Sequence, residues 1–227
     1  MQPRLLAIII TVLPLITTNA VYLLSAYEGN VPWCMPYFDG CTTISQAARS
    51  GNSIYIYRAT MIAYSIFLIW FWVYTRQWLI HVLGDAKKLS STIMWLGIAG
   101  ALSLMVYIDY LGTTGEVNRF MRRYGIMVFF TFTPLAQVLL LKLHYKSLSI
   151  AASVNLKRPI LQFQLYVLLV MCIIGITSII LDVAQLKTYQ SENIVEWTFA
   201  LLLNIYFAGM IFIWRDYRYH LSEQSHG

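Results

Sequence analysis

Five charged residues lie about one helical turn inside the ends of long apolar runs: Arg58, Asp109, Arg123, Asp182 and Glu196. A charge at the centre of a bilayer costs about 2.5–3.5 kcal/mol on insertion scales, and less near the interface. Pairing an arginine with a carboxylate offsets that cost. Guanidinium groups also bind phosphate in a bidentate manner, and carboxylates can orient arginines or contact hydroxyls and amines. This set predicts a polar cavity at one face of the bilayer.

Smaller polar residues extend the set inward along the same runs. Ser178 shares a helix face with Asp182 at four-residue spacing, and Asn204 follows Glu196 by eight residues, on roughly the same side. Interfacial charges can simply extend to lipid headgroups, and small polar residues can simply pack helices. That alternative accounts for any one residue, but charges from five helices at one depth favour a site. The residues expected to bind a headgroup are Arg58, Asp109, Glu116, Arg123, Asp182 and Glu196. Those expected to line the pocket are Ser45, Tyr57, Ser65, Ser178 and Asn204.

The composition requires a membrane around these residues. Hydrophobic residues make up 59% of the 227-residue chain and charged residues 11%, whereas soluble domains carry roughly 25% charged residues. Spans of about 20 residues leave room for six or seven helices and no separate soluble domain. The net charge of +6 is explained by loop Lys and Arg that orient the chain, so no nucleic-acid partner is expected.

Six apolar runs predict an all-α, polytopic membrane bundle of six transmembrane helices in one integral membrane domain, 1–227. A long outer connection, about 28–54, and a tail, about 217–227, complete this domain. The expected spans are Leu5–Tyr27, Tyr55–Thr75, Ser91–Leu111, Phe120–Leu143, Pro159–Leu181 and Ile194–Trp214.

The loop charges predict that both termini are cytoplasmic. Of the 16 Lys and Arg residues, ten fall at the ends that share the termini and six at the opposite ends, as expected for the positive-inside rule. Arg119, Arg122 and Arg123 cluster on the outer side against this rule. Most of the acidic residues also lie at outer ends, which topology does not explain because acids contribute little to it. The outer face therefore calls for a functional explanation.

The outer connection contains Cys34 and Cys41, seven residues apart. On an oxidising face they could close a disulfide, which we expect, or remain two free thiols. The segment 42–51 that follows could form a short helix lying on the membrane surface and ending at Gly51.

Short motifs occur in this region and at the start of the second span, at positions Cys34, Pro36, Ile44, Ser45, Ala47, Tyr57 and Arg58. They resemble motifs of the Frag/DRAM/Sfk superfamily. Its members include the post-GPI-attachment lipid-remodelling factors and the N-terminal domain of the yeast protein that remodels GPI anchors with ceramide. Two weaker similarities occur at Gly112 to Glu116 with Gly125, and at Glu196 followed by Trp197. The resemblance spans nearly the whole chain and implies six helices and a role in lipid remodelling, autophagy or membrane organisation.

The chain departs from that family where histidines are often found. It has Arg122 and Arg123 at the start of the fourth span, and Tyr64 before Ser65 in the second. Family chemistry that needs an outer-leaflet histidine would therefore use another group here or be missing.

The favoured function is binding, or help in remodelling, of a phospholipid or glycolipid at the outer leaflet. The alternatives are a lipid acyltransferase or hydrolase, with Ser45 or an acid of the cluster as nucleophile or base, and a small transporter or sensor. No catalytic residue is assigned, because no histidine lies near the cluster. No metal or cofactor is expected, since Cys34 and Cys41 alone would offer soft ligands there. The expected partner is membrane lipid, with no protein partner indicated. The expected location is the bacterial inner membrane, or a eukaryotic endomembrane or plasma membrane.

Overall fold

The computed structural model describes residues 2–84, 86–148 and 156–215; the predicted tail, 217–227, lies outside them. Within these ranges the chain is helical, without a strand. The helices are α1 (Pro3–Tyr27), α2 (Pro36–Asp39), α3 (Ile44–Ala48), α4 (Ser53–Leu83), α5 (Lys87–Tyr110), α6 (Glu116–Leu148), α7 (Arg158–Val183) and α8 (Tyr189–Ile213). Six of them are long and apolar enough to cross a membrane, which confirms the predicted fold class.

The helix ends differ from the predicted ones mainly in α4 and α6. α4 continues through Arg76 and His81 to Leu83, where Thr75 was the predicted end, and α6 begins at Glu116 rather than Phe120. The reason is that an apolar run marks only the part of a helix that suits hydrocarbon. Backbone hydrogen bonds continue through polar residues with good helix propensity, such as Arg and Glu.

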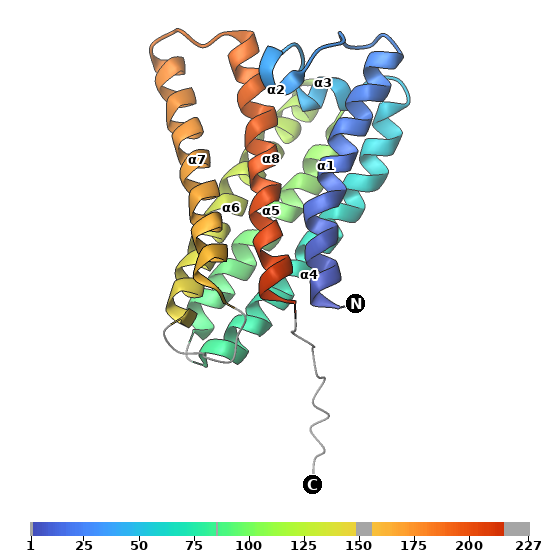
Figure 1. Cartoon of the computed structure of the whole chain (residues 1–227). Helices are drawn as coiled ribbons and strands as arrows, with labels where there is room; N and C mark the ends of the chain where they lie inside the picture. The colour runs from blue at the N-terminus through green and yellow to red at the C-terminus, as the bar shows by residue number, and fades with distance from the viewer. Residues whose placement is uncertain (1, 85, 149–155, 216–227) are drawn as a thin grey trace.

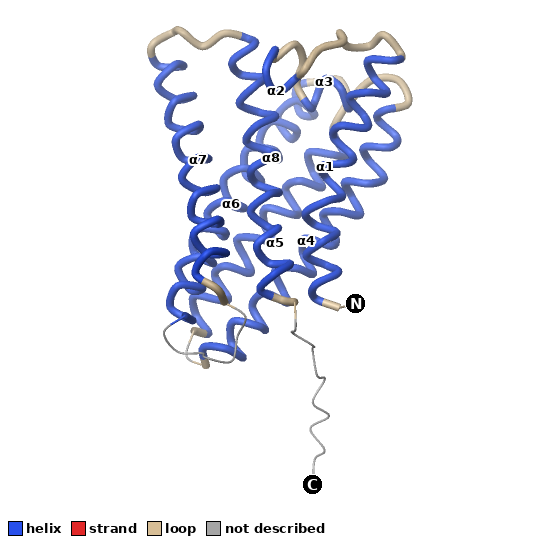
Figure 2. Tube along the Cα trace, viewed as in Figure 1, coloured by secondary structure: helices blue, strands red, loops and turns tan. Residues whose placement is uncertain are grey.

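The long helices run alternately up and down, so the start of α1 and the end of α8 lie at the same end of the bundle (Figure 1). We call this the terminal end. The short helices α2 and α3 lie over the opposite end (Figure 2), which we call the capped end because residues 28–52 close it. All six long helices contribute to one cluster of buried apolar side chains. The bundle therefore has a single core with a structured cap over one end.

Two glycines bring α4, α5 and α6 close together. A Cβ on Gly97 of α5 would clash with the ring of Trp72 on α4, and a Cβ on Gly125 of α6 would lie 2.8 Å from the carbonyl oxygen of Ser103 on α5. Small residues let helix backbones approach in this way in membrane bundles. α6 is therefore fixed closely against α5 near the capped end.

α7 packs against the bundle along only half of its length. Its last buried residue is Met171, and the isoleucines that follow, such as Ile176 and Ile179, are exposed. A Cβ on Gly175 would meet no atom within 4 Å. Figure 1 shows α7 diverging from α8 toward the capped end. The second half of α7 therefore stands away from its neighbours.

A buried polar network anchors the other half of α7. Nδ1 of His144 on α6 lies 3.2 Å from Oε1 of Gln164, and Nε2 of Gln164 donates to the carbonyl oxygen of Tyr206 on α8 at 3.4 Å. Gln164 also lies close to Gly209, where an added Cβ would be 2.7 Å from Nε2. α6, α7 and α8 are therefore joined near the terminal end.

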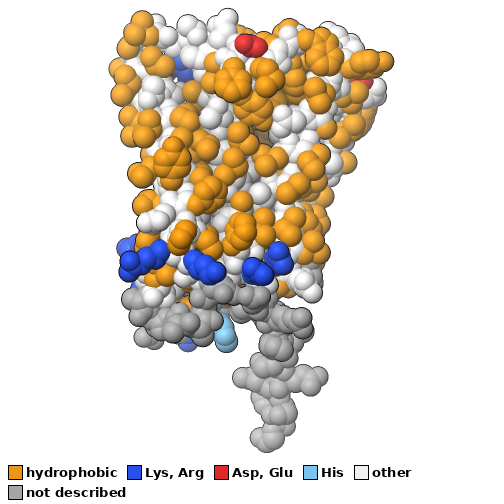
Figure 3. Space-filling view, in the orientation of Figure 1, with side chains coloured by type: hydrophobic (Ala, Val, Ile, Leu, Met, Phe, Trp, Pro, Cys, Tyr) orange, Lys and Arg blue, Asp and Glu red, His pale blue; other side chains and the backbone are white. Residues whose placement is uncertain are grey.

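The charges at the surface follow the two ends of the bundle. On the face in Figure 3, Lys and Arg side chains form a band at the terminal end, and apolar side chains cover most of the surface above it. This band agrees with the charge asymmetry in the sequence. The assignment of the terminal end to the cytoplasm stays a prediction.

Candidate functional site

The cap is held by a disulfide and by tyrosines beneath it. Cys34 and Cys41 are joined, with 6.5 Å between their Cα atoms, which confirms the predicted bond. The Tyr22 hydroxyl donates to the carbonyl oxygen of Cys34 at 2.7 Å and accepts from its N–H at 2.8 Å. Tyr37 of α2 packs edge-on against Trp197 of α8. Burial raises the pKa of the Tyr37 phenol above its ordinary value.

The segment 42–51 contains the short helix expected for it, but this helix is shorter than expected and packs one face against the bundle, while Arg49 and Gly51 are exposed. Only Ile44–Ala48 is helical, and Ile44, Ala47 and Ala48 are all buried. These residues recur at three- and four-residue spacing, so they form one apolar face that docks onto the bundle. Thr43 and Gln46 form a capping box that fixes the start of this helix.

Side chains of α8 hold the cap in place. Nε1 of Trp197 donates to the carbonyl oxygen of Thr42 at 2.9 Å, and Nδ2 of Asn193 donates to that of Gly40 at 2.7 Å. Glu196 lies one turn after Asn193 and accepts a hydrogen bond from the α3 backbone. The first turns of α8 therefore position α3 above the space beside them.

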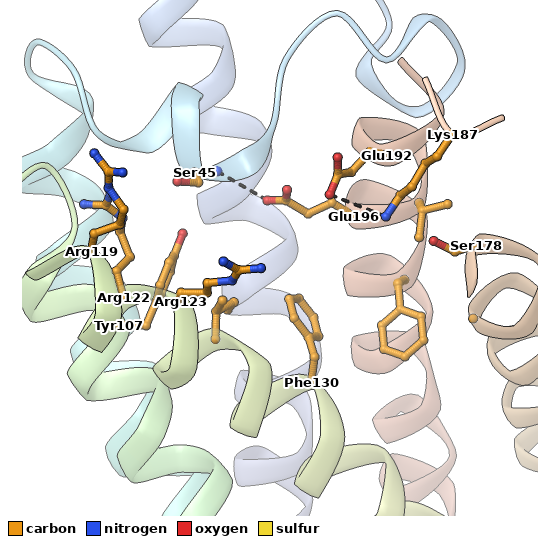
Figure 4. Close-up of a pocket in the computed structure, with 14 residues that line it drawn as sticks. Ser45, Tyr107, Arg119, Arg122, Arg123, Phe130, Ser178, Lys187, Glu192 and Glu196 are labelled. Carbon is orange, nitrogen blue, oxygen red and sulfur yellow. Dashed lines mark hydrogen bonds and ion pairs between the residues drawn. The ribbon is translucent and has the colours of Figure 1, made fainter. Parts of the chain in front are cut away.

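That space is a cavity of about 520 Å³ between α6, α7 and α8, beneath α3 (Figure 4). One side of it is the second half of α7, after Met171, which we call the free half of α7. We call the space the lipid-facing cavity, because this half stands away from the bundle. Its polar rim lies toward the capped end, and its wall is apolar. The polar lining residues are Ser45, Tyr107, Arg119, Arg122, Arg123, Ser178, Lys187, Glu192 and Glu196. The apolar lining residues are Ile126, Phe130, Val195 and Phe199, with Gly175 beside them.

The rim carries more positive than negative charges, and only some of them form ion pairs. Its four cations face two carboxylates, Glu192 and Glu196. Lys187 Nζ lies 3.5 Å from Glu192. In the ranges that the structure describes, Arg119 and Arg123 form no ion pair. Figure 4 shows Arg123 and Lys187 entering from opposite sides. The rim therefore offers two guanidinium groups and a net positive charge to a ligand.

Arg58 does not line this cavity. Its Nη2 donates to the carbonyl oxygens of Asp109 at 3.0 Å and Leu111 at 2.6 Å, which are among the unpaired carbonyls at the end of α5. The Asp109 side chain and Glu116 are exposed, and neither belongs to the lining. The structure therefore does not bring these three residues into the cavity, and Arg58 instead fixes the connection between α5 and α6.

The other expected headgroup residues lie at or beside the cavity. Arg123 and Glu196 line it, as do the expected lining residues Ser45 and Ser178. Asp182 lies outside the lining, with its carboxylate exposed and 4.0 Å from Lys187 Nζ. The structure therefore gathers part of the expected set around one space and leaves Asp182 at its edge.

The remaining expected lining residues lie deeper. Tyr57 and Asn204 line a small inner cavity of about 40 Å³, which shares Tyr107 and Glu196 with the larger one. Tyr64 donates to Oδ1 of Asn204 at 3.2 Å in this region. The inner cavity has room for about one water molecule.

Ser65, also expected to line the pocket, lines neither cavity. It is buried, and its hydroxyl donates to the carbonyl oxygen of Met61 at 2.9 Å. Such a bond within one helix satisfies a serine in an apolar span without any ligand.

Five polar lining residues were not assigned to the site from the sequence: Tyr107, Arg119, Arg122, Lys187 and Glu192. A signal existed for the two arginines. Arg119, Arg122, Ile126 and Phe130 recur at three- and four-residue spacing, which places them on one face of a helix. Tyr107 gave no signal, because it is one of many aromatic residues in apolar runs.

No cluster of three or more His, Cys, Asp or Glu side chains suited to a metal occurs in the part of the chain that the structure describes. The chain matches no family model, no curated protein and no solved structure. Membership of the Frag/DRAM/Sfk superfamily stays a prediction from short motifs.

Proposed function

We propose that this chain is an integral membrane protein that holds a phospholipid by its headgroup in the lipid-facing cavity. One observation carries the proposal. The cavity joins a cationic polar rim to an apolar wall, and it lies beside a helix half that packs against little else. An amphiphile with an anionic headgroup matches this arrangement, because its headgroup suits the cationic rim and its apolar chains suit the wall.

The rim suits a phosphate group. Guanidinium forms bidentate, charge-assisted hydrogen bonds with phosphate oxygens, and Arg119 and Arg123 have no carboxylate partner among the described residues. The two carboxylates already have partners within the protein: Glu192 pairs with Lys187, and Glu196 accepts from the α3 backbone. The cavity volume of about 520 Å³ falls within the usual range for ligand pockets.

The wall suits the start of the acyl chains. Ile126 and Phe130 of α6 line the cavity below the arginines, and on α7 Gly175 has open space where a side chain would be. Acyl chains would leave sideways between α6 and α7 into the bilayer, so the headgroup need not cross apolar protein. The free half of α7 would then pack against lipid.

Orientation and location belong to the same proposal. The Lys and Arg band supports a cytoplasmic terminal end, because loop Lys and Arg are in excess on that side of the membrane. In that orientation the cavity would open to the outer leaflet. The membrane would be the bacterial inner membrane, or a eukaryotic endomembrane or plasma membrane. The resemblance to the Frag/DRAM/Sfk superfamily supports a lipid ligand. Chemical remodelling of that lipid remains a prediction.

Lipid retained by the purified protein tests the proposal. Arg123→Gln removes a cation from the rim, whereas Arg158→Gln removes one from the terminal end and serves as the matched control. Hydrogen bonds to charged groups contribute about 1.5–3 kcal/mol, so we expect roughly a tenfold or greater loss of anionic phospholipid from Arg123→Gln in quantitative mass spectrometry. Equal amounts of the same lipids in both variants and the wild type would overturn the proposal.

A further inference from the structure

A second hollow of about 320 Å³ lies beside the lipid-facing cavity at the capped end. It is lined by Arg49, Arg119, Arg122 and the connection 112–115 between α5 and α6. Arg119 and Arg122 also line the lipid-facing cavity. The two spaces therefore share a wall made of two arginines, and one ligand could contact both.

The second hollow differs from the first in chemistry. Its lining consists of three arginines, two threonines and two glycines, without a carboxylate or a large apolar side chain. It offers no surface for an acyl chain. Three guanidinium groups without an acid among them form a strongly cationic space, and Arg-rich spaces of this kind suit phosphate.

The hollow is built by contacts that fix its parts. Nη1 of Arg122 donates to the carbonyl oxygen of Thr113 at 3.1 Å, which ties the connection to α6. Gly112 has a φ of +78° and lies against Arg49, whose carbonyl oxygen would be 3.3 Å from an added Cβ. These contacts place the connection between α3 and α6, so the arginines gather without a ligand.

The backbone adds a further preference for anions. Gly115 has a φ of +107°, and α6 begins at the next residue, Glu116. The first N–H groups of a long helix lack partners within the helix and carry partial positive charge. This end of α6 thus adds to the field of the three arginines.

We propose that this hollow binds a phosphate group carried on the headgroup of the lipid in the neighbouring cavity. The ligand is then a phospholipid whose headgroup bears a phosphomonoester in addition to its phosphodiester. This inference rests on the proposed function and narrows its ligand class. The shared arginines set the two phosphates side by side, and a phosphomonoester carries close to two negative charges at pH 7, which matches the more cationic space.

The test compares two soluble lipids that differ by one phosphate. Dioctanoyl phosphatidylinositol and dioctanoyl phosphatidylinositol 4-phosphate are titrated into the purified full-length chain in detergent by isothermal calorimetry. We expect the wild type to bind the phosphorylated lipid roughly tenfold or more tightly, since charge-assisted contacts are strong. Arg49→Gln alters the hollow alone. It should reduce the difference in affinity between the two lipids to about threefold or less while leaving phosphatidylinositol binding unchanged.

Two further variants separate the inference from the proposed function. Arg123→Gln should lower the affinity for both lipids by a similar factor, because Arg123 lines the larger cavity and not the second hollow. Arg49→Lys keeps the charge and should retain part of the preference, which guards against loss of folding in Arg49→Gln. A wild type that binds neither lipid would contradict the proposed function. A wild type that binds both equally would overturn the inference alone.

Inorganic phosphate distinguishes a headgroup phosphate from a free anion. Titrated into the wild type without added lipid, it should bind far more weakly than the phosphorylated lipid, because it gains nothing from the neighbouring cavity. Phosphate binding that depends on Arg49, found together with equal binding of the two lipids, would overturn the assignment to a headgroup.

Discussion

The carboxylate of Glu196 on α8 accepts a hydrogen bond from the backbone N–H of Ser45 on α3 at 3.4 Å (Figure 4). The two residues are 151 positions apart in the sequence, so the contact joins the cap to the wall of the lipid-facing cavity. Glu196 also supplies negative charge to the rim. One side chain therefore fixes the position of α3 and moderates the charge that a ligand meets.

The substitution Glu196→Gln should separate these two effects. The amide oxygen can still accept from Ser45, so the free energy of unfolding should change by less than about 1 kcal/mol. Loss of the negative charge should strengthen binding of anionic phospholipid by up to about 1 kcal/mol, or roughly fivefold. Mass spectrometry of retained lipid measures this.

Asp109→Asn is the control for Glu196→Gln, because Asp109 is an exposed acid near the same end and outside the lining. It should leave lipid retention unchanged. A loss of lipid in Glu196→Gln would argue against a purely moderating role and indicate that the carboxylate holds a cationic or hydroxyl group of the ligand.

Gly175→Trp should fill the lipid-facing cavity without disturbing the bundle. An added Cβ at Gly175 meets no atom within 4 Å, and Gly175 lines the cavity. We expect the melting temperature to stay close to that of the wild type while retained phospholipid falls severalfold. Gly175→Ala is the matched control; it should retain lipid and gain up to about 1 kcal/mol from helix propensity. Full lipid retention in the tryptophan variant would place the ligand elsewhere.

Loss of the disulfide should loosen the cap. The double variant Cys34→Ser with Cys41→Ser removes the cross-link that encloses α2. Closing a loop of this length stabilises a fold by about 2–3 kcal/mol in the chain-entropy account, so the melting temperature in detergent should drop. A reducing agent should lower the melting temperature of the wild type to that of the double variant, and it should leave the melting temperature of the double variant unchanged. Cys172→Ser, which alters the free cysteine, is the control and should melt like the wild type. Equal melting temperatures for the wild type, the double variant and Cys172→Ser would contradict a stabilising role of the disulfide.

Gln164→Leu should weaken the anchor of α7. It leaves Nδ1 of buried His144 without its partner, and an unsatisfied buried polar group costs about 1–3 kcal/mol. Gln162→Leu is the control, because Gln162 is exposed on the same helix. Thermal unfolding followed by circular dichroism measures both. A control that is destabilised as much as Gln164→Leu would contradict the assigned role of the network.

The sequence predicted the spans well because lipid constrains composition directly. A segment that crosses hydrocarbon must be apolar for about 20 residues, and this leaves a clear signal for six helices. The disulfide was also predictable, since Cys34 and Cys41 are close in sequence and lie in one connection. The docking of the cap was not, because hydrogen bonds such as that from Asn193 to Gly40 join residues whose types reveal nothing about each other.

The sequence predicted the depth of the charged residues in the membrane but not the directions in which their side chains point. Arg58 and Arg123 both lie near the capped end, as their places in the apolar runs indicated. Arg58 turns to the carbonyl groups that end α5, whereas Arg123 lines the cavity. Helices in a membrane are apolar toward lipid as well as toward protein, so the pattern that reveals the buried face of a soluble helix is weak here. The direction of each charge had to come from the packing.

The free half of α7 makes the surrounding membrane part of the structure of the site. Residues such as Ile176 and Ile179 are exposed, so acyl chains rather than protein side chains press on this segment. A helix of this kind changes its tilt with the thickness of the bilayer, at a cost of only a fraction of a kcal/mol per ångström of mismatch. The side of the cavity that α7 forms would then move with the thickness of the bilayer.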